Sequence, residues 1–421
     1  SLYISLVIVG LAILLPFNCF TLAVDYFNTK LPGCNIVFAI NIVFLVFNLV
    51  GSVFGFLLVE SFSYTTRIVA GLSLAGVGIL AVTLFDVVLE VSSETALHAA
   101  TLVVVGITAL GTSVSQTSAY GFTTMLPKSY TQGVMVGESI AGTVVSFTRV
   151  ITKAATLTDL TLGVAIFFGV CIGVLLVAVL LFLVSRKATF VDHCISQCQA
   201  PGTVQHELQR TEEIEVRIIL QSYASDILVK QGSTQESKDY GATLNASKPL
   251  PDADFDWTGA ALIRIETIRD LWPYVVGIGT TYCVTASLYP AVFTLVQSKT
   301  LGSWMPILLF CIYNTFDLVG KIVSSLGNIW SGVQLMLLAV SRFLFVAVIL
   351  LCVMPLGHPI LSHELYSCCF AAFFGITNGY LGSIFMIEAG HHIESGRREM
   401  AGNIMTLALC FGLSIGAGLA Y

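Results

Sequence analysis

Charged residues are scarce in this sequence. Asp, Glu, Lys and Arg make up 10% of its 421 residues, whereas a soluble globular domain has about 25%. Half of these charged residues, 22 of 44, fall between Ser185 and Asp270, so two long apolar segments flank one polar segment. This distribution excludes an ordinary soluble enzyme and is typical of a membrane protein with one large polar loop.

The sequence also lacks several signatures of soluble function. Its 11 cysteines follow no disulfide framework. The nearest approach to a metal site lacks the paired spacing of a zinc module and consists of His193, Cys194, Cys198 and His206. The net charge of −6 does not suit nucleic acid, and no ATP-binding loop of the GxxxxGK type is present. We therefore expect no metal, no cofactor, no nucleic-acid partner and no enzyme activity.

Long apolar runs take up most of the two flanking segments. In lipid, a continuous run of about 20 apolar residues satisfies its backbone polar groups as a helix. Run length predicts eleven transmembrane helices, at residues 2–24, 36–59, 67–91, 99–125, 132–155, 160–184, 271–297, 303–326, 332–354, 365–389 and 400–421. The predicted fold is therefore that of an all-α polytopic membrane protein in direct contact with the lipid bilayer.

The polar segment divides the predicted helices into six and five. We predict an N-terminal six-helix bundle at residues 1–184, a cytoplasmic, partly disordered loop at 185–270, and a C-terminal five-helix bundle at 271–421. Lys and Arg concentrate at the helix ends on the side of this loop, which predicts a cytoplasmic N-terminus and an extracellular C-terminus. Because Ser1 already lies inside the first apolar run, we expect further residues to precede it.

Seven charged residues in the predicted helices stand out, because an unpaired charge within a membrane helix costs several kcal/mol. They are Asp86, Glu138, Arg149, Asp317, Lys321, Arg342 and Glu388. Asp317 and Lys321 are four residues apart and can form an ion pair on one helix face. This pair is either a structural bridge or part of a gate that lines a central cavity, and Arg67 is placed to reach it.

Glu138 has no cationic partner on its own helix. The positions three and four residues away hold Val134, Met135, Ala141 and Gly142. A carboxylate among small residues indicates a wall that a cationic ligand approaches closely. The alternative is a protonated carboxyl group that forms a hydrogen bond with a neighbouring helix.

Aromatic residues close to the charged positions are candidates for cation-binding faces, because a cation is attracted to the face of an aromatic ring. The candidates are Phe17, Phe44, Tyr120, Tyr282 and Tyr289. Most aromatic residues of such an apolar chain simply pack, so this signal is weak by itself.

Four short motifs occur in order along the predicted helices. They are Pro16-Phe17-Asn18, Asn314-x-x-Asp317-x-x-Gly320-Lys321, Asn378-Gly379-Tyr380 and Ala401-Gly402-Asn403-x-Met405. Together they resemble the signature of the equilibrative nucleoside transporter family. The resemblance implies an eleven-helix, six-plus-five relative of the major-facilitator fold with alternating access to a central site. The chain departs from the family at Phe17, which replaces the usual aromatic residue, and at Lys321, where nucleoside carriers have arginine.

Three longer stretches are similar to the plasma membrane monoamine transporter branch of that family. They are residues 65–68, 116–121 and 125–139. The resemblance implies that Glu138 stands where nucleoside-selective members carry a glutamine that contacts the base. Asp86 likewise matches an acidic position of the third helix in this branch. A carboxylate in place of the amide makes this wall anionic.

The resemblance therefore implies a facilitative carrier of serotonin, dopamine and other small organic cations in the plasma membrane, driven by the membrane potential. The substrate would enter past Asp86 and pair with Glu138. The other residues of the expected substrate site are Phe17, Asn18, Phe44, Tyr282 and Asp317. The alternative is an equilibrative or proton-stimulated carrier of nucleosides such as adenosine, with a protonated Glu138. The sequence predicts neither the oligomeric state nor the ranking of substrates.

Overall fold

A computed structural model of the chain describes residues 2–22, 36–57, 62–84, 94–154, 160–198, 257–296, 298, 300–354 and 363–420. Every regular element within these ranges is a helix. Eleven spans are long and apolar enough to cross a membrane, which confirms the predicted fold class and helix number. Asp86 and most of the 185–270 segment, residues 199–256, lie outside the described ranges.

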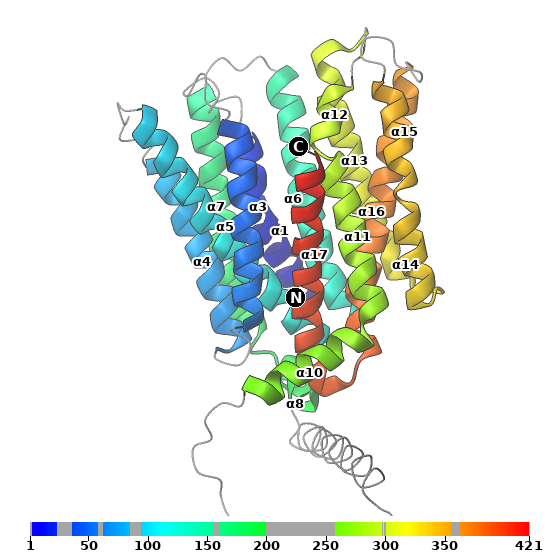
Figure 1. Ribbon diagram of the computed structural model, residues 1–421. Coiled ribbons are helices and arrows are strands. Elements are labelled where there is room, and N and C mark those ends of the chain that lie inside the picture. The colour runs from blue at the N-terminus through cyan, green and yellow to red at the C-terminus, as the bar shows by residue number, and fades with distance from the viewer. Residues whose placement is uncertain are drawn as a thin grey trace, which may run out of the picture.

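Six single helices form the spans before the polar segment (Figure 1). They are α1 (Leu2–Leu22), α3 (Ile36–Leu57), α4 (Tyr64–Thr83), α5 (Glu94–Thr124), α6 (Lys128–Ala154) and α7 (Leu160–Ser185). We refer to them as the N-terminal helices. Helix α1 packs mainly against α6 and α7, while α5 packs against α3 and α4.

The five spans after the polar segment are here named the C-terminal helices. They comprise α11 (Trp272–Leu288) with α12 (Ala291–Leu295), α13 (Met305–Val323), α14 (Gly332–Ser341) with α15 (Leu344–Val353), α16 (Glu364–His392) and α17 (Arg398–Ala420). Two predicted helices are thus each built from two pieces. The first break lies at Pro290, which has no N–H group to donate to the helix, and the second lies at Arg342 and Phe343.

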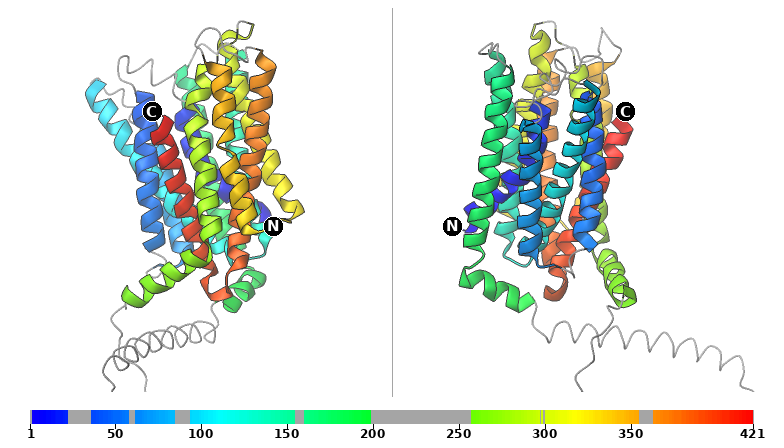
Figure 2. Two further views of the ribbon diagram at one scale, coloured as in Figure 1. Left: turned by 45° about the vertical axis from the view of Figure 1, so that its right-hand side comes forward. Right: turned by 90° about the vertical axis from the view of Figure 1, so that its left-hand side faces the viewer.

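Short helices flank these spans. They are α8 (Thr189–Cys198), α10 (Trp257–Asp270) and the 3-10 turns η2 (Gly302–Trp304), η3 (Ser324–Leu326) and η4 (Ser395–Arg397). Helices α8 and α10, from the two ends of the polar segment, lie at the same end of the bundle (Figures 1 and 2). We call this the inner end, and the opposite end, where α17 finishes, the outer end.

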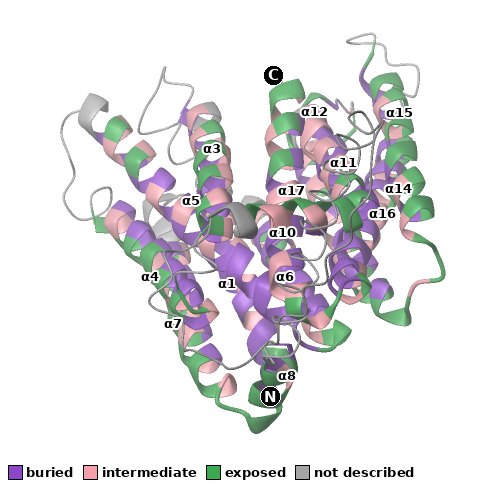
Figure 3. Cartoon of the chain, turned by 60° about the horizontal axis from the view of Figure 1, so that its bottom comes forward, coloured by how far each residue is buried: buried purple, intermediate pink, exposed green. Residues whose placement is uncertain are grey.

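The outward faces of the spans are apolar, as a lipid environment requires. On α7, for example, Ile166, Leu180 and Val184 are all exposed. Figure 3 shows the buried residues along the sides of the helices that face the interior of the bundle. Among these buried residues are several polar and charged ones, so the interior contains the groups that a pathway for a polar solute needs.

Glycines allow two helix pairs to approach closely. A Cβ atom on Gly137 would overlap the backbone of Val7, so α6 lies directly against α1. A Cβ atom on Gly379 would overlap the carbonyl group of Asp317, so α16 lies directly against α13. The second approach brings Asn378 next to Asp317, and the first fixes the wall that carries Glu138.

Candidate functional site

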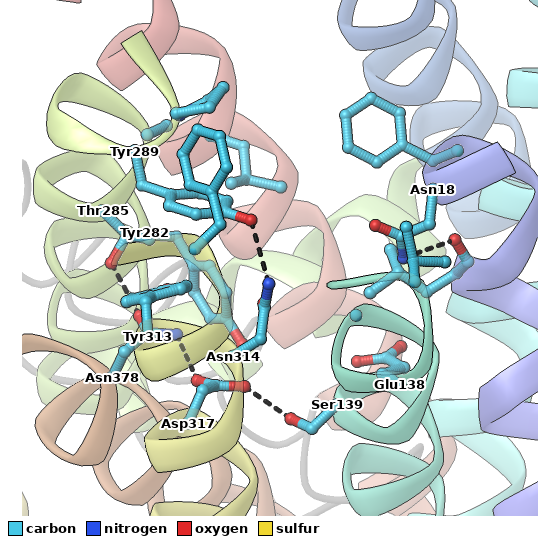
Figure 4. Close-up of a pocket in the computed structure, with 18 of the residues that line it drawn as sticks. Asn18, Glu138, Ser139, Tyr282, Thr285, Tyr289, Tyr313, Asn314, Asp317 and Asn378 are labelled. Atoms are coloured by element: carbon cyan, nitrogen blue, oxygen red, sulfur yellow. Dashed lines mark hydrogen bonds between the residues drawn. The ribbon is translucent and has the colours of Figure 1, made fainter. Parts of the chain in front are cut away.

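A cavity of about 270 Å³ lies between the N-terminal and the C-terminal helices. Helices α1, α3, α5 and α6 line one side, and α11, α13, α16 and α17 line the other. The residues of the predicted substrate site that line this cavity are Phe17, Asn18, Phe44, Glu138, Tyr282 and Asp317. Figure 4 shows Asn18 and Glu138 on one wall and Tyr282, Tyr289 and Asn314 on the other. The remaining predicted member, Asp86, falls outside the described residues.

The carboxyl group of Glu138 is buried and has two neighbours from α5 that can donate hydrogen bonds to it, Gln116 and the Tyr120 hydroxyl. Gln116 Nε2, from α5, donates to Glu138 Oε1 at 2.7 Å. The ion pairs among the described residues do not include Glu138. Because the amide of Gln116 donates to a carboxyl oxygen, this bond needs no proton on Glu138. The wall therefore presents a carboxyl group whose hydrogen-bonding neighbours are neutral.

Aromatic rings stand on both walls of the cavity. Phe17 and Phe44 pack together with ring centroids 4.6 Å apart, on the same side as Glu138. Opposite them, Tyr289 stacks on Tyr313 at 4.4 Å. Tyr120, also a candidate cation-binding residue, does not line the cavity. Its hydroxyl lies behind the wall, next to the Met135 sulfur and the Glu138 carboxyl group.

Asp317 is surrounded by permanent donors. Ser139 Oγ, on α6, donates to Asp317 Oδ2 at 2.5 Å, and Asn378 Nδ2, on α16, donates to Asp317 Oδ1 at 2.6 Å. Lys321 Nζ lies 3.7 Å from Asp317 Oδ2, which confirms the predicted ion pair. The bond from Ser139 joins the N-terminal to the C-terminal helices beside Glu138 (Figure 4). Asp317 therefore lines the cavity with both oxygens already occupied.

Arg342 supports Asp317 from behind. Its guanidinium is buried and donates to Thr285 Oγ1 at 3.1 Å and to Asn378 Oδ1 at 3.2 Å, and it rests 4.8 Å from the centre of the Phe374 ring. These bonds orient the Asn378 amide so that its nitrogen points at Asp317. The sequence predicts Arg342 as a charge inside a membrane helix but does not predict its partners, because they come from α11 and α16.

Contacts at the inner end join the two sets of helices. Arg67 on α4 forms an ion pair with Glu399 on α17, and Lys128 Nζ on α6 lies 2.7 Å from Glu388 Oε1 on α16. The expectation that Arg67 reaches Asp317 and Lys321 is therefore wrong, because α4 begins beside the first turn of α17 at the inner end. Gln132 Nε2 adds a bond to the carbonyl oxygen of Lys321, at 3.1 Å.

The cavity lies on the outer side of these contacts. Its lining includes Pro290, just after α11, and Ala417 and Ala420, in the last turn of α17 at the outer end. The N-terminal and C-terminal helices thus meet at the inner end and enclose the cavity toward the outer end. A solute bound beside Glu138 would have to break the inner contacts to leave on that side.

Sequence reasoning missed the residues that complete these arrangements, chiefly Gln116, Glu399 and the pairing of Asn378. Each is a polar residue inside or next to an apolar run, but its role depends on a helix that is distant along the chain. Within the described residues no group of three His, Cys, Asp or Glu side chains is arranged to hold a metal ion.

Comparisons with known proteins agree with this architecture. The family model described as nucleoside transporter matches residues 100–421. The chain is 34% identical to equilibrative nucleoside transporter 4 of Danio rerio and to that of Homo sapiens, over all of this chain and 83% and 82% of those proteins. It is 27% identical to equilibrative nucleotide transporter 1 of Arabidopsis thaliana, over all of this chain and 85% of that protein.

Solved structures of transporters share the fold. A bacterial homologue of the iron transporter ferroportin superposes with a TM-score of 0.59 at 11% identity, over 99% of this chain and 91% of that one. The E. coli fucose:proton symporter gives a TM-score of 0.57 at 13% identity, over 99% and 89%. The predicted relation to the major-facilitator fold is confirmed. With the family match and the relatives of 34% identity over its whole length, the chain belongs to the equilibrative nucleoside transporter family and is a facilitative, multi-pass membrane transporter.

Proposed function

We propose that this transporter carries monoamines and other small organic cations across the plasma membrane by alternating access. The observation that carries the proposal is the Glu138 carboxyl group, which is buried in the cavity wall with Gln116 as its donor and with no ion pair to any described residue. Lys321 acts on Glu138 electrostatically but forms its ion pair with Asp317, so a bound ammonium would be the cation in direct contact with Glu138.

The surroundings of Glu138 suit an aromatic amine. A hydrogen bond to a charged group is worth about 1.5–3 kcal/mol, so the ammonium would be held mainly by the carboxylate. The rings of Phe17, Phe44 and Tyr282, which line the same cavity, offer faces for the aromatic part of the substrate and for the cation.

In the transport step, the inner end of the bundle would open and the outer end would close. With the N-terminus cytoplasmic, as the distribution of Lys and Arg predicts, the cavity faces the outside and the substrate enters there. The pairs Arg67–Glu399 and Lys128–Glu388 must then separate before it is released to the cytoplasm. The membrane potential favours entry of a cation by about 2.3 kcal/mol per charge for each 100 mV.

Nucleoside transport is the second candidate, because the family model and the relatives carry that name. Amides on the cavity wall, from Asn18, Asn48 and Gln116, suit the hydrogen-bonding edges of a base. In that case Glu138 would be protonated and would act as one more neutral hydrogen-bonding group.

Uptake of radiolabelled serotonin and adenosine, measured at two pH values in cells that express wild type and Glu138→Gln, separates the two candidates. We expect Glu138→Gln to lower serotonin uptake by at least about tenfold with surface expression maintained. Glu364→Gln is the matched control, because it removes a carboxylate that is outside the cavity and outside the inner-end pairs and that accepts hydrogen bonds from Ser298 and Thr300. Serotonin uptake at the wild-type rate in Glu138→Gln would remove Glu138 from the site. Adenosine uptake that competes strongly with serotonin and survives in this variant would favour the nucleoside carrier.

A further inference from the structure

Helix α10 lies outside the membrane-spanning helices, yet it carries a row of exposed apolar side chains. Ile265 is 65% exposed, Ile268 is 42% exposed, and Trp272, at the start of α11, is 49% exposed. Ala261, one turn before Ile265, is exposed as well. Spacings of four, three and four residues place these side chains on one side of a helix with 3.6 residues per turn. We call this row of four residues the α10 stripe.

Contacts with the bundle determine which side of α10 carries this stripe. Thr267, on another face of the helix, is fully buried. The guanidinium carbon of Arg264 lies 5.0 Å from the centre of the Phe56 ring on α3, and Arg397 Nη1 on η4 donates to Asp270 Oδ2 at 2.9 Å. Helix α10 is thus held against both the N-terminal and the C-terminal helices. The stripe is therefore on a defined side of α10 that is turned away from the bundle.

The stripe is continuous with the surface of the protein that faces lipid. Figure 1 shows α10 running obliquely across the inner end, immediately before α11 enters its span. Val276, one turn after Trp272, is 46% exposed on the outward side of this span. Tryptophan is typical of the membrane–water interface, because its ring is apolar and its N–H group is polar. Arg269, exposed beside Ile268, is placed for the phosphate groups at the same level.

We propose that α10 is an interfacial helix whose apolar stripe binds the phospholipids of the leaflet at the inner end. The stripe lies at the boundary between the headgroups and the acyl chains, with Trp272 nearest the chains. Glu266 and Asp270, which are on another side of the helix at about 100° per residue, remain in contact with water. The inference is independent of which solute the carrier transports.

The test places a photoreactive side chain at single positions of the full chain. p-Benzoylphenylalanine replaces Ile265, Ile268, Glu266 or Val276 in cells that express the transporter. After irradiation, mass spectrometry identifies each adduct as a lipid, a peptide of this chain or another protein. Val276 is the positive control, because it lies on the outward side of a span. Glu266 is the matched control, because it neighbours Ile265 but lies on another face.

We expect lipid adducts at positions 265 and 268 to be at least about fivefold more abundant than at position 266. Adducts of positions 265 and 268 with peptides from residues 199–256, or with another protein, would show that a different partner covers the stripe and would overturn the inference. Equal lipid adducts at positions 265 and 266 would overturn it as well, and so would lipid adducts at position 276 alone.

A second measurement keeps the inference testable if the photoreactive variants do not reach the membrane. Ile265→Trp and Glu266→Trp are reconstituted in vesicles of phosphatidylcholine and phosphatidylserine, with or without bromine on the acyl chains close to the headgroup. The fluorescence that Ile265→Trp adds to the wild-type signal should lose at least about half its intensity in the brominated lipid, because bromine quenches only nearby rings. The fluorescence that Glu266→Trp adds should lose little. Equal quenching of the two variants, or none in Ile265→Trp, would overturn the inference.

Discussion

The two walls of the cavity each present a buried carboxyl group, but the two groups differ in their hydrogen-bond and ion-pair partners. On the C-terminal wall, Asp317 accepts hydrogen bonds from Ser139 and Asn378 and pairs with Lys321. On the N-terminal wall, Glu138 has only neutral hydrogen-bonding neighbours among the described residues, Gln116 and Tyr120, and no ion pair. The same functional group is therefore saturated by the protein on one wall and left with capacity for a ligand on the other.

This difference distinguishes a carboxyl group that stabilises the fold, Asp317, from one that can bind the solute, Glu138. A buried charge with permanent partners cannot be removed without leaving those partners unsatisfied. A buried carboxyl group with spare acceptor capacity can gain a donor from the solute and lose it again. Variants that change one wall at a time can break or sharpen this distinction.

The largest effect is expected for Asp317→Asn. Removal of this charge leaves Lys321 without its buried partner, a change that costs about 3–5 kcal/mol when one partner of a buried pair is lost. Uptake of every solute should collapse, and the thermal midpoint of the detergent-solubilised protein should fall clearly. Glu138→Gln, the comparison, should lose amine uptake while keeping its thermal midpoint. A stable Asp317→Asn that loses only amine uptake would show that both walls bind the cation.

A smaller effect is expected at the inner end, for the pair Arg67–Glu399. The Arg67 side chain is 2% exposed, but that of Glu399 is 19% exposed. Water therefore solvates part of the charge that remains when its partner is removed, which lowers the cost of breaking this pair. Each single change, Arg67→Gln or Glu399→Gln, should lower uptake by about tenfold, and the double variant should lose little more than either single one. Fully additive losses in this double-mutant cycle would show that the two residues act separately.

Next in size is Gln116→Leu. This change removes the hydrogen bond that Gln116 donates to Glu138 without altering the charge of Glu138, so the carboxyl group is less well oriented for the ammonium. The KM for serotonin should rise about fivefold, within the range for a bond to a charged group, with a smaller change in maximal rate. An unchanged KM would indicate that Glu138 is oriented by other contacts.

The smallest effect is expected for Lys128→Gln. Although Lys128 lies 2.7 Å from Glu388, its side chain is 49% exposed, and exposed ion pairs contribute at most about 1 kcal/mol. Uptake should change by no more than about twofold at physiological salt. A loss as large as that of Arg67→Gln would show that this pair, too, holds the inner end closed.

Much of the architecture was predictable because membrane helices obey local rules. Apolar run length alone predicts the eleven spans, and the i,i+4 spacing predicts the pair Asp317–Lys321. Run length alone treats the seventh and ninth spans as single helices, because the sequence on both sides of the breaks at Pro290 and at Arg342 is apolar. The motif residues Phe17 and Asn18 reach the cavity as the family resemblance implies, but the partner of Arg67 was assigned wrongly.

The sequence by itself determined which segments are helices and which charges are placed where lipid does not tolerate them, because both follow from the cost of burying polar groups in hydrocarbon. Only the tertiary structure decided which charges have partners. Ser139 meets Asp317 across 178 positions and Arg67 meets Glu399 across 332. Hydrogen bonds and ion pairs act over a few ångströms, so distant helices must first be packed together before one carboxyl group is satisfied and another is left for a ligand.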